Sequence, residues 1–136
     1  MKSYVLDANV VVRFFTQDPP SLGRAARKLF EEATQGTVEL RLDPAIAAEV
    51  VFVLTKVYQV ERGSVAESLL DLISNPGVRV VSVGMLRDAL LRFKDFSVDF
   101  ADALVAAIGA AEGLPVASFD RDLDKFKDVA RFEPKV

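Results

Sequence analysis

The sequence predicts a three-layer α/β/α domain built on a mostly parallel sheet of four to five strands. Short apolar or β-branched runs, which are typical of buried strands, recur along the chain. Stretches with helical periodicity separate these runs. Strands that alternate with helices are typical of parallel sheets covered by helices on both faces. The chain has 136 residues and no internal repeat, so we expect residues 1–136 to form one domain.

The first half of the chain is predicted to hold two strands and four helices. The helix that begins at Ser21 is the clearest, because apolar residues recur along it at helical spacing and Gly36 closes it. Asp43 followed by Pro44 predicts another helix start, since a capping acid precedes a proline at the first helical position. In order, the elements are a strand at 4–6, helices at 10–16 and 21–36, a strand at 37–42, and helices at 43–58 and 64–75.

The second half is predicted to hold two strands, two helices and a small C-terminal edge strand. Pro76 and Gly77 stop the helix before them, and Gly113 ends a later helix as a C-cap. Gly109, in the middle of that later helix, indicates a close approach to a neighbouring element. The elements are a strand at 78–83, helices at 85–93 and 99–112, a strand at 116–119 and the edge strand near 131–132.

The residue inventory excludes several classes of enzyme. The chain has no cysteine and no histidine. Thiol nucleophiles, thiolate zinc sites and Ser-His-Asp machinery are therefore excluded, and carboxylates, lysine and metal-bound water are left as candidate bases. The net charge of −3 gives no global basic field for nucleic acid, so such binding needs local patches or bound cations. We see no secretory signal and no apolar run near the ~20 residues of a membrane span, and we expect a cytoplasmic protein.

Two acids come directly after predicted strands. Asp7 follows the apolar run at 4–6, and Asp120 follows the run at 116–119. The carboxyl ends of parallel strands are where open α/β sheets keep their ligand crevices. The alternative interpretation is that Asp7 or Asn9 only caps the helix that follows, since both residue types are favoured N-caps.

The acids that follow Asp120 do not form a calcium-binding loop. Their spacing resembles the start of an EF-hand, but Lys125 stands at the sixth position, where that loop needs glycine. We therefore expect Asp122 and Asp124 to be cap and surface acids of a short helix.

Two further acids lie inside predicted helices. Glu49 is the only polar residue in the stretch 45–54, and a carboxylate in so apolar a helix needs a partner or a metal. The alternative is that Glu49 points out through a gap in the packing or pairs with an arginine such as Arg13. Asp99 and Asp102 lie three apart and share one face of a first helical turn. Asp99 is the expected cap of that helix, whereas Asp102 precedes an almost entirely small or apolar run.

These four acids could face one crevice. In a parallel sheet Asp7 and Asp120 end neighbouring strands at the same edge, and Glu49 and Asp102 lie near the starts of their helices. Two carboxylates 4 Å apart repel by about 4 kcal/mol at an effective dielectric of 20. Either some of the acids are protonated or divalent cations neutralise them. Oxygen ligands of this kind favour Mg²⁺ or Mn²⁺ over zinc, and such a site activates water and clamps a phosphodiester.

The chain resembles the PIN-domain nucleases, and among them the VapC-type toxin ribonucleases of type II toxin–antitoxin pairs. The resemblance covers nearly the whole chain and depends on the order of four fragments. These are V-L-D-A-N-V near the N-terminus, A-A-E-V-V-F-V-L, D-F-A-D-A-L-V-A-A, and A-S-F-D-R-D-L near the C-terminus.

The resemblance implies a Mg²⁺- or Mn²⁺-dependent endoribonuclease with a quartet of acids. Asp7 and Asp102 would be the principal metal ligands, and Glu49 and Asp120 would complete the site. Asn9 and Ser118 occupy positions where the family often has a small polar residue that supports the pocket, and Asp99 is a second-shell candidate. The family also implies an RNA substrate, a homodimer and a cognate antitoxin protein that inserts side chains, often arginine, into the acidic pocket.

Three other interpretations are open. A haloacid-dehalogenase-type phosphatase also begins with an aspartate after its first strand, but it needs a second aspartate where this chain has Asn9. The chain could instead be a non-catalytic protein-interaction module with a PIN-like fold. It could also be a PIN nuclease that acts in RNA processing outside a toxin pair.

Overall fold

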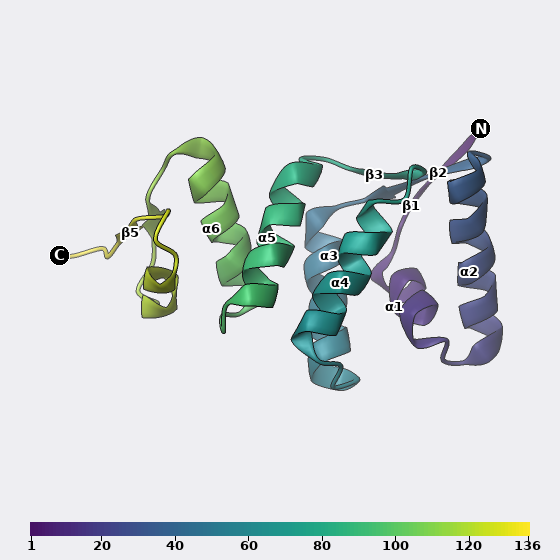
Figure 1. Cartoon of the computed structure of the whole chain (residues 1–136), viewed down its shortest axis with the longest axis horizontal. Coiled ribbons are helices and arrows are strands. Elements are labelled where there is room, and N and C mark those ends of the chain that lie inside the picture. The colour runs from purple at the N-terminus through teal and green to yellow at the C-terminus, as the bar shows by residue number, and fades with distance from the viewer. The chain divides into compact units, whose positions relative to one another are not determined.

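The computed structural model describes residues 1–136 and divides them into two compact units (Figure 1). We call Met1–Val83 unit 1 and Gly84–Val136 unit 2. Unit 1 holds a three-stranded sheet in the order β1-β2-β3, and unit 2 holds the two-stranded sheet β4-β5. Every strand pair is parallel. The predicted α/β class with a parallel sheet is therefore confirmed, with the five strands divided between two sheets. The prediction of a single domain stays a prediction.

In unit 1 the central strand positions the core. Val38, Leu40 and Leu42 are buried at alternate positions of β2, so this strand turns its apolar side to the helices. Helix α2 contacts β2, helix α4 contacts β3, and α1 contacts both α2 and α3. The elements are β1 (Lys2–Val5), α1 (Ala8–Thr16), α2 (Pro20–Gln35), β2 (Val38–Leu42), α3 (Pro44–Phe52), the π-helix η1 (Val53–Val57), α4 (Arg62–Ile73) and β3 (Val78–Val80).

Three predicted helix starts in unit 1 are wrong by one or two residues. Helix α1 begins at Ala8 rather than Val10. Helix α2 begins at Pro20, with Pro19 rather than Ser21 at the N-cap, because proline fits the first helical position without losing a hydrogen bond. Helix α4 begins at Arg62, before Ser64, because the Glu61 carboxylate accepts a hydrogen bond from the Ser64 amide at 2.9 Å and caps the helix. The predicted Asp43 cap is confirmed, since its carboxylate accepts from the Ala45 amide at 2.8 Å.

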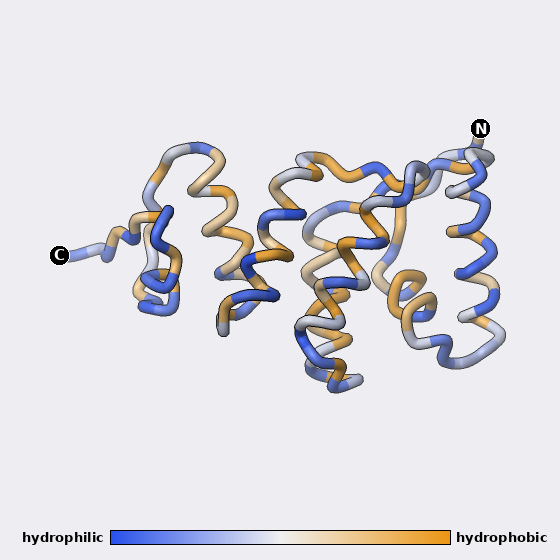
Figure 2. The backbone as a smooth tube through the Cα atoms, viewed as in Figure 1, coloured by the Kyte–Doolittle hydropathy of each residue, from blue (hydrophilic) through white to orange (hydrophobic).

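In unit 2 two helices precede the small sheet. Helix α5 buries Leu86, Ala89 and Leu90 on one side, and polar and apolar residues alternate around it in Figure 2. Helix α6 ends at Gly113, whose φ of 67° is left-handed as expected for a C-cap. The elements are α5 (Val83–Asp95), α6 (Phe100–Glu112), β4 (Val116–Ala117), the 3₁₀ helix η2 (Arg121–Lys125) and β5 (Arg131–Phe132).

The close approach inferred at Gly109 is confirmed. A Cβ atom there would lie 2.9 Å from the Leu114 carbonyl oxygen and 3.0 Å from a Val116 methyl carbon. The missing side chain thus lets the chain after α6 fold back against the helix and start β4. None of the helices combines the length and the hydropathy that crossing a membrane would require.

Gly77→Ala tests the tightest backbone contact in unit 1. A Cβ atom at Gly77 would lie 2.2 Å from the Ala33 carbonyl oxygen, and backbone cannot rotate away as a flexible side chain can. We expect Gly77→Ala to lower the free energy of unfolding by about 3 kcal/mol, the upper end for overpacked sites. Gly84→Ala is the matched control, because its Cβ would meet no atom within 4 Å and lies in α5. It should stabilise the chain by about 0.5 kcal/mol. Urea unfolding measures the free energy of unfolding of both variants. Equal changes in the two variants would contradict the inference that the backbone contact at Gly77 excludes a side chain.

Candidate metal centre

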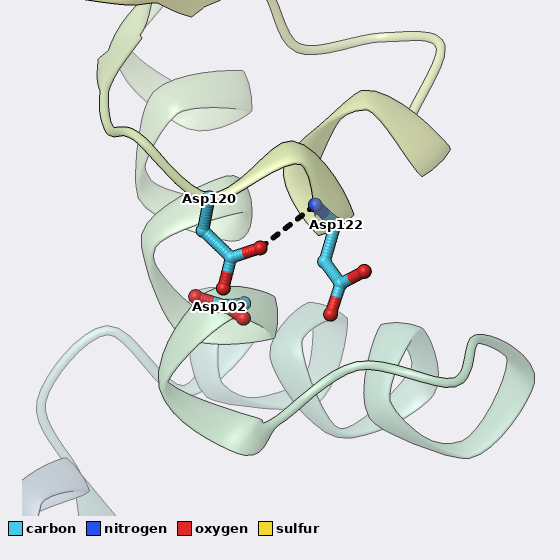
Figure 3. Close-up of side chains that lie close together, drawn as sticks. All are labelled: Asp102, Asp120 and Asp122. Atoms are coloured by element: carbon cyan, nitrogen blue, oxygen red, sulfur yellow. Dashed lines mark hydrogen bonds between the residues drawn. The ribbon is translucent and has the colours of Figure 1, made fainter.

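Three carboxylates of unit 2 converge in space (Figure 3). Asp102, Asp120 and Asp122 each offer an oxygen, and these oxygens all lie within 4.8 Å of one another. Asp102 lies in the first turn of α6. Asp120 is the N-cap residue of η2, and Asp122 lies in the first turn of η2. We call these three residues the acidic cluster.

Helix α6 fixes the position of Asp102. The small side chains of Ala103, Ala106 and Ala107 are buried, so this face of the helix packs closely against the rest of the protein. Asp102 is half-buried in the first turn. Asp99 occupies the N-cap position as expected, but its side chain makes no capping hydrogen bond.

The segment 118–122 is ordered by its own side chains. The Asp120 amide donates to the Ser118 hydroxyl oxygen at 2.9 Å, and the Asp122 amide donates to Asp120 Oδ1 at 2.9 Å. Asp120 therefore caps η2 with one oxygen. Its other oxygen points toward Asp102 in Figure 3. Ser118 thus acts on the cluster by orienting Asp120.

The cluster brings like negative charges close together. Burial raises the pKa of the Asp102 carboxyl, and the charges of Asp120, Asp99 and Asp122 and a hydrogen bond with Asp120 raise it further. The Lys125 ammonium lies 3.4 Å from Asp122 and also donates to the Ser97 carbonyl oxygen at 2.9 Å. A single ammonium, 43% exposed, cannot offset three carboxylates.

The donor set suits a hard divalent cation. The cluster offers only carboxylate oxygens, which Mg²⁺ and Mn²⁺ prefer to nitrogen or sulfur. Oxygens on opposite sides of an octahedral Mg²⁺ lie about 4.2 Å apart, close to the 4.8 Å within which the cluster oxygens lie. The cluster could therefore hold such an ion after small side-chain movements.

A sequence model of the PIN domain family matches residues 4–131, which is nearly the whole chain. The chain belongs to the PIN domain family. PIN domains are in general metal-dependent nucleases that use divalent ions, in agreement with the acidic cluster. Comparison with curated proteins gives no match.

The other two acids of the predicted quartet belong to unit 1 of this PIN domain. Asp7 stands at the N-cap position of α1, and its side chain makes no capping hydrogen bond. Glu49 lies in α3 and is exposed, while Ala47, Val50 and Val51 of that helix are buried. The prediction that Asp7, Glu49, Asp102 and Asp120 share one pocket stays a prediction.

Arg13 is not the partner of Glu49. Its guanidinium donates to the Asp18 carbonyl oxygen and to the Tyr58 hydroxyl, both at 3.1 Å. Asn9 is exposed in the first turn of α1 of the PIN domain. The supporting role expected of Asn9 stays a prediction.

Sequence reasoning missed Asp122 as a member of the cluster. Asp124 is a surface acid as expected, since it pairs with Arg131 at 2.9 Å. Asp122 is different, because its amide bonds to Asp120 and this contact turns both carboxylates to the same end of η2. The available signal was the pattern Asp-x-Asp at a helix start, where the capping residue and the second helical residue lie close together.

The stability of the metal-free PIN domain should depend on the charge of Asp102. The folded chain binds the Asp102 proton more tightly than the unfolded chain, because the folded-state pKa is raised. The stability from this group is therefore present below about pH 3.9 and is lost as the pH rises through the higher folded-state pKa. In EDTA we expect Asp102→Asn to be more stable than the wild type at neutral pH, with the gap closing toward about pH 4. Urea unfolding across this range measures the gap. A gap independent of pH would exclude the charge as its cause.

Proposed function

We propose that this PIN domain is a Mg²⁺- or Mn²⁺-dependent endoribonuclease that acts in the cytoplasm as the toxin of a VapC-type toxin–antitoxin pair. The observation that supports this most is the acidic cluster, in which Asp102, Asp120 and Asp122 converge and the neighbouring acids raise the pKa of the Asp102 carboxyl. Membership of the PIN domain family supports nuclease chemistry. The fragments at Asp7, Glu49, Asp102 and Asp120 support the toxin branch.

Each acid has a distinct part in the proposal. Asp102 and Asp120 hold the cation, with Asp120 oriented by its bond to the Asp122 amide. As the family resemblance implies, Asp7 and Asp102 would be the principal ligands of the cation, and Glu49 would complete the site with Asp120. A bound divalent cation supplies a water of lowered pKa and neutralises charge on the phosphate. Without it, the carboxylates would repel an RNA backbone.

The proposed partners follow from the same charge. An antitoxin that carries arginine suits a pocket rich in carboxylates, because the guanidinium fork matches carboxylate geometry. A homodimer is the proposed assembly, as expected for the toxin branch of the family. Mass measurement by light scattering during size-exclusion chromatography would test the dimer.

Sequencing of RNA ends after brief expression tests the nuclease proposal and names its target. Wild-type protein should create discrete new RNA ends, and Asp102→Asn should create none of them. Glu112→Gln is the matched control, since it removes one exposed carboxylate from the last residue of the same helix. It should give the wild-type ends. New ends that persist in Asp102→Asn would exclude this site as their source.

Growth separates the toxin from its alternatives. Cleavage with growth arrest, relieved by a small DNA-binding protein encoded beside this gene, would support the toxin. Cleavage without arrest would instead support a nuclease of RNA processing. The absence of cleavage with either Mg²⁺ or Mn²⁺ would favour a non-catalytic interaction module.

A further inference from the structure

A largely buried arginine in unit 2 holds the segment that carries two of the cluster acids. Arg131 lies on β5, and its side chain is 13% exposed. Its Nε and Nη2 atoms donate to the two carboxylate oxygens of Asp124, at 2.9 and 3.2 Å. Its Nη1 atom donates to the Ser118 carbonyl oxygen at 3.1 Å and to Glu133 at 3.0 Å. Such a planar, bidentate contact restricts orientation more strongly than a single hydrogen bond.

The two anchor points of Arg131 flank the acids. Ser118 and Asp124 are the ends of a seven-residue segment, and Asp120 and Asp122 lie between them. Inside the segment the Ser118 hydroxyl orients Asp120, and Asp120 orients Asp122. The strands beside it, β4 and β5, are only two residues long each. The regular backbone pairing here is therefore short. The guanidinium adds a polar restraint on the segment to the one that the burial of Leu123 provides.

We propose that Arg131 is a positioning residue for the metal centre: by holding Ser118 and Asp124 it keeps Asp120 and Asp122 in reach of Asp102. The proposal depends on the proposed function, because it needs a cation at the acidic cluster. Groups that orient metal ligands through hydrogen bonds typically change metal affinity by 10–100-fold when they are removed. Arg131 touches none of the cluster carboxylates in its hydrogen bonds, so it acts through the segment.

The affinity of Arg131 variants for the cation distinguishes positioning from a simple effect of charge. The guanidinium is positive, so its charge alone repels a cation, and Arg131→Gln would then bind the cation more tightly. Arg131→Lys keeps the charge and would then change nothing. Positioning predicts weaker binding in both, because neither glutamine nor lysine can make the fork to Asp124 and reach Ser118 together. Asp124→Asn should also weaken binding, by loosening the same clamp.

Arg92 provides the matched control. It is an equally buried arginine of unit 2, 11% exposed, and its fork binds Asp128 at 2.8 and 2.5 Å. It also bonds to Asp88 at 3.1 Å. Both acids lie outside the segment 118–124. Arg92→Gln should therefore cost stability as Arg131→Gln does, but leave the cluster in place.

The test is a titration of the full chain with Mn²⁺, with the free ion followed by electron paramagnetic resonance. We expect Arg131→Gln and Arg131→Lys to bind Mn²⁺ 10–100-fold more weakly than the wild type, and Arg92→Gln to stay within about threefold. Amide exchange without metal gives an independent measure. The amides of Asp120 and Asp122 should exchange faster in Arg131→Lys than in the wild type or Arg92→Gln, because their acceptors are no longer held.

The outcomes separate this inference from the proposed function. Mn²⁺ binding that is lost in Asp102→Asn but unchanged or tighter in Arg131→Gln and Arg131→Lys would overturn the role of Arg131 alone. Equal weakening in Arg92→Gln would overturn it too, since stability would then be the cause. Wild-type binding that Asp102→Asn does not change would place no cation at the cluster and overturn both. If Arg131→Gln does not fold, Arg131→Lys and Asp124→Asn carry the same test.

Discussion

Purified Asp102→Asn protein is expected to cleave RNA about 10³-fold more slowly than the wild type, a loss of about 4 kcal/mol of transition-state stabilisation. The reason is that Asp102 is the half-buried member of the acidic cluster and offers a carboxylate oxygen from the first turn of α6 to the proposed cation. Asparagine keeps the size and one oxygen of the side chain but removes the charge. Steady-state cleavage of a labelled RNA with saturating Mn²⁺ measures the loss.

Asp102→Asn should be more stable than the wild type in EDTA, although its activity is lower. A lower activity together with a higher stability distinguishes a lost metal ligand from a damaged fold. In a variant that loses activity because it unfolds, both the activity and the free energy of unfolding are lower than in the wild type. Asp102→Asn should instead lose the carboxylate repulsion that raises the Asp102 pKa. Mn²⁺ should then raise the unfolding temperature of the wild type and leave that of the variant unchanged, because an ion stabilises only the state that binds it. Activity within tenfold of the wild type would exclude Asp102 as a principal ligand.

The secondary structure could be predicted because its signals are local. Gly36 and Gly113 end their helices in the left-handed conformation, and Asp43 caps α3 with its carboxylate. Each of these features depends on a few neighbouring residues. The end of α3 was harder, since residues 53–57 continue it as a π-helix that no residue type announces. The predicted strands at 78–83 and 116–119 shrink to three and two residues, because only these find a paired neighbour.

The acidic cluster could be predicted only in part, because it depends on contacts between distant residues. Asp102 and Asp120 were expected together from the ends of separate elements, and the structure brings their carboxylates within reach. Asp122 and Asp124 were expected to be cap and surface acids of a short helix, but Asp120 is the cap. Nothing in the neighbourhood of Asp122 shows that the Asp120 side chain turns back to its amide. The clamp from Arg131 spans seven residues to Asp124, and a charged residue at a strand end carries no signal of its partner.

In unit 1, Asp7→Ala is expected to abolish most activity at almost no cost in stability. The Asp7 side chain makes no capping hydrogen bond, and α1 is held by the burial of Ala8, Val11 and Val12. The free energy of unfolding should therefore fall by only a few tenths of a kcal/mol. Because Asp7 is a principal ligand of the proposed centre, its replacement by alanine should nevertheless lower the rate of RNA cleavage by about 10³-fold. Glu49→Gln, at an exposed position of α3, should show the same pattern.

Asp43→Ala is the matched control, because we expect it to lower stability and to leave RNA cleavage unchanged, the reverse of Asp7→Ala. Asp43 is also an N-cap aspartate of unit 1, but its carboxylate accepts from the Ala45 amide at 2.8 Å. Its removal should cost about 1 kcal/mol of stability, the usual value for a lost cap, and leave cleavage within about threefold of the wild type. Urea unfolding and RNA cleavage measured on the same preparations give both quantities. Both aspartates occupy an N-cap position, but Asp43→Ala would lower stability and keep cleavage, whereas Asp7→Ala would keep stability and lower cleavage. Full activity in Asp7→Ala would instead restrict the nuclease site to the acidic cluster of unit 2.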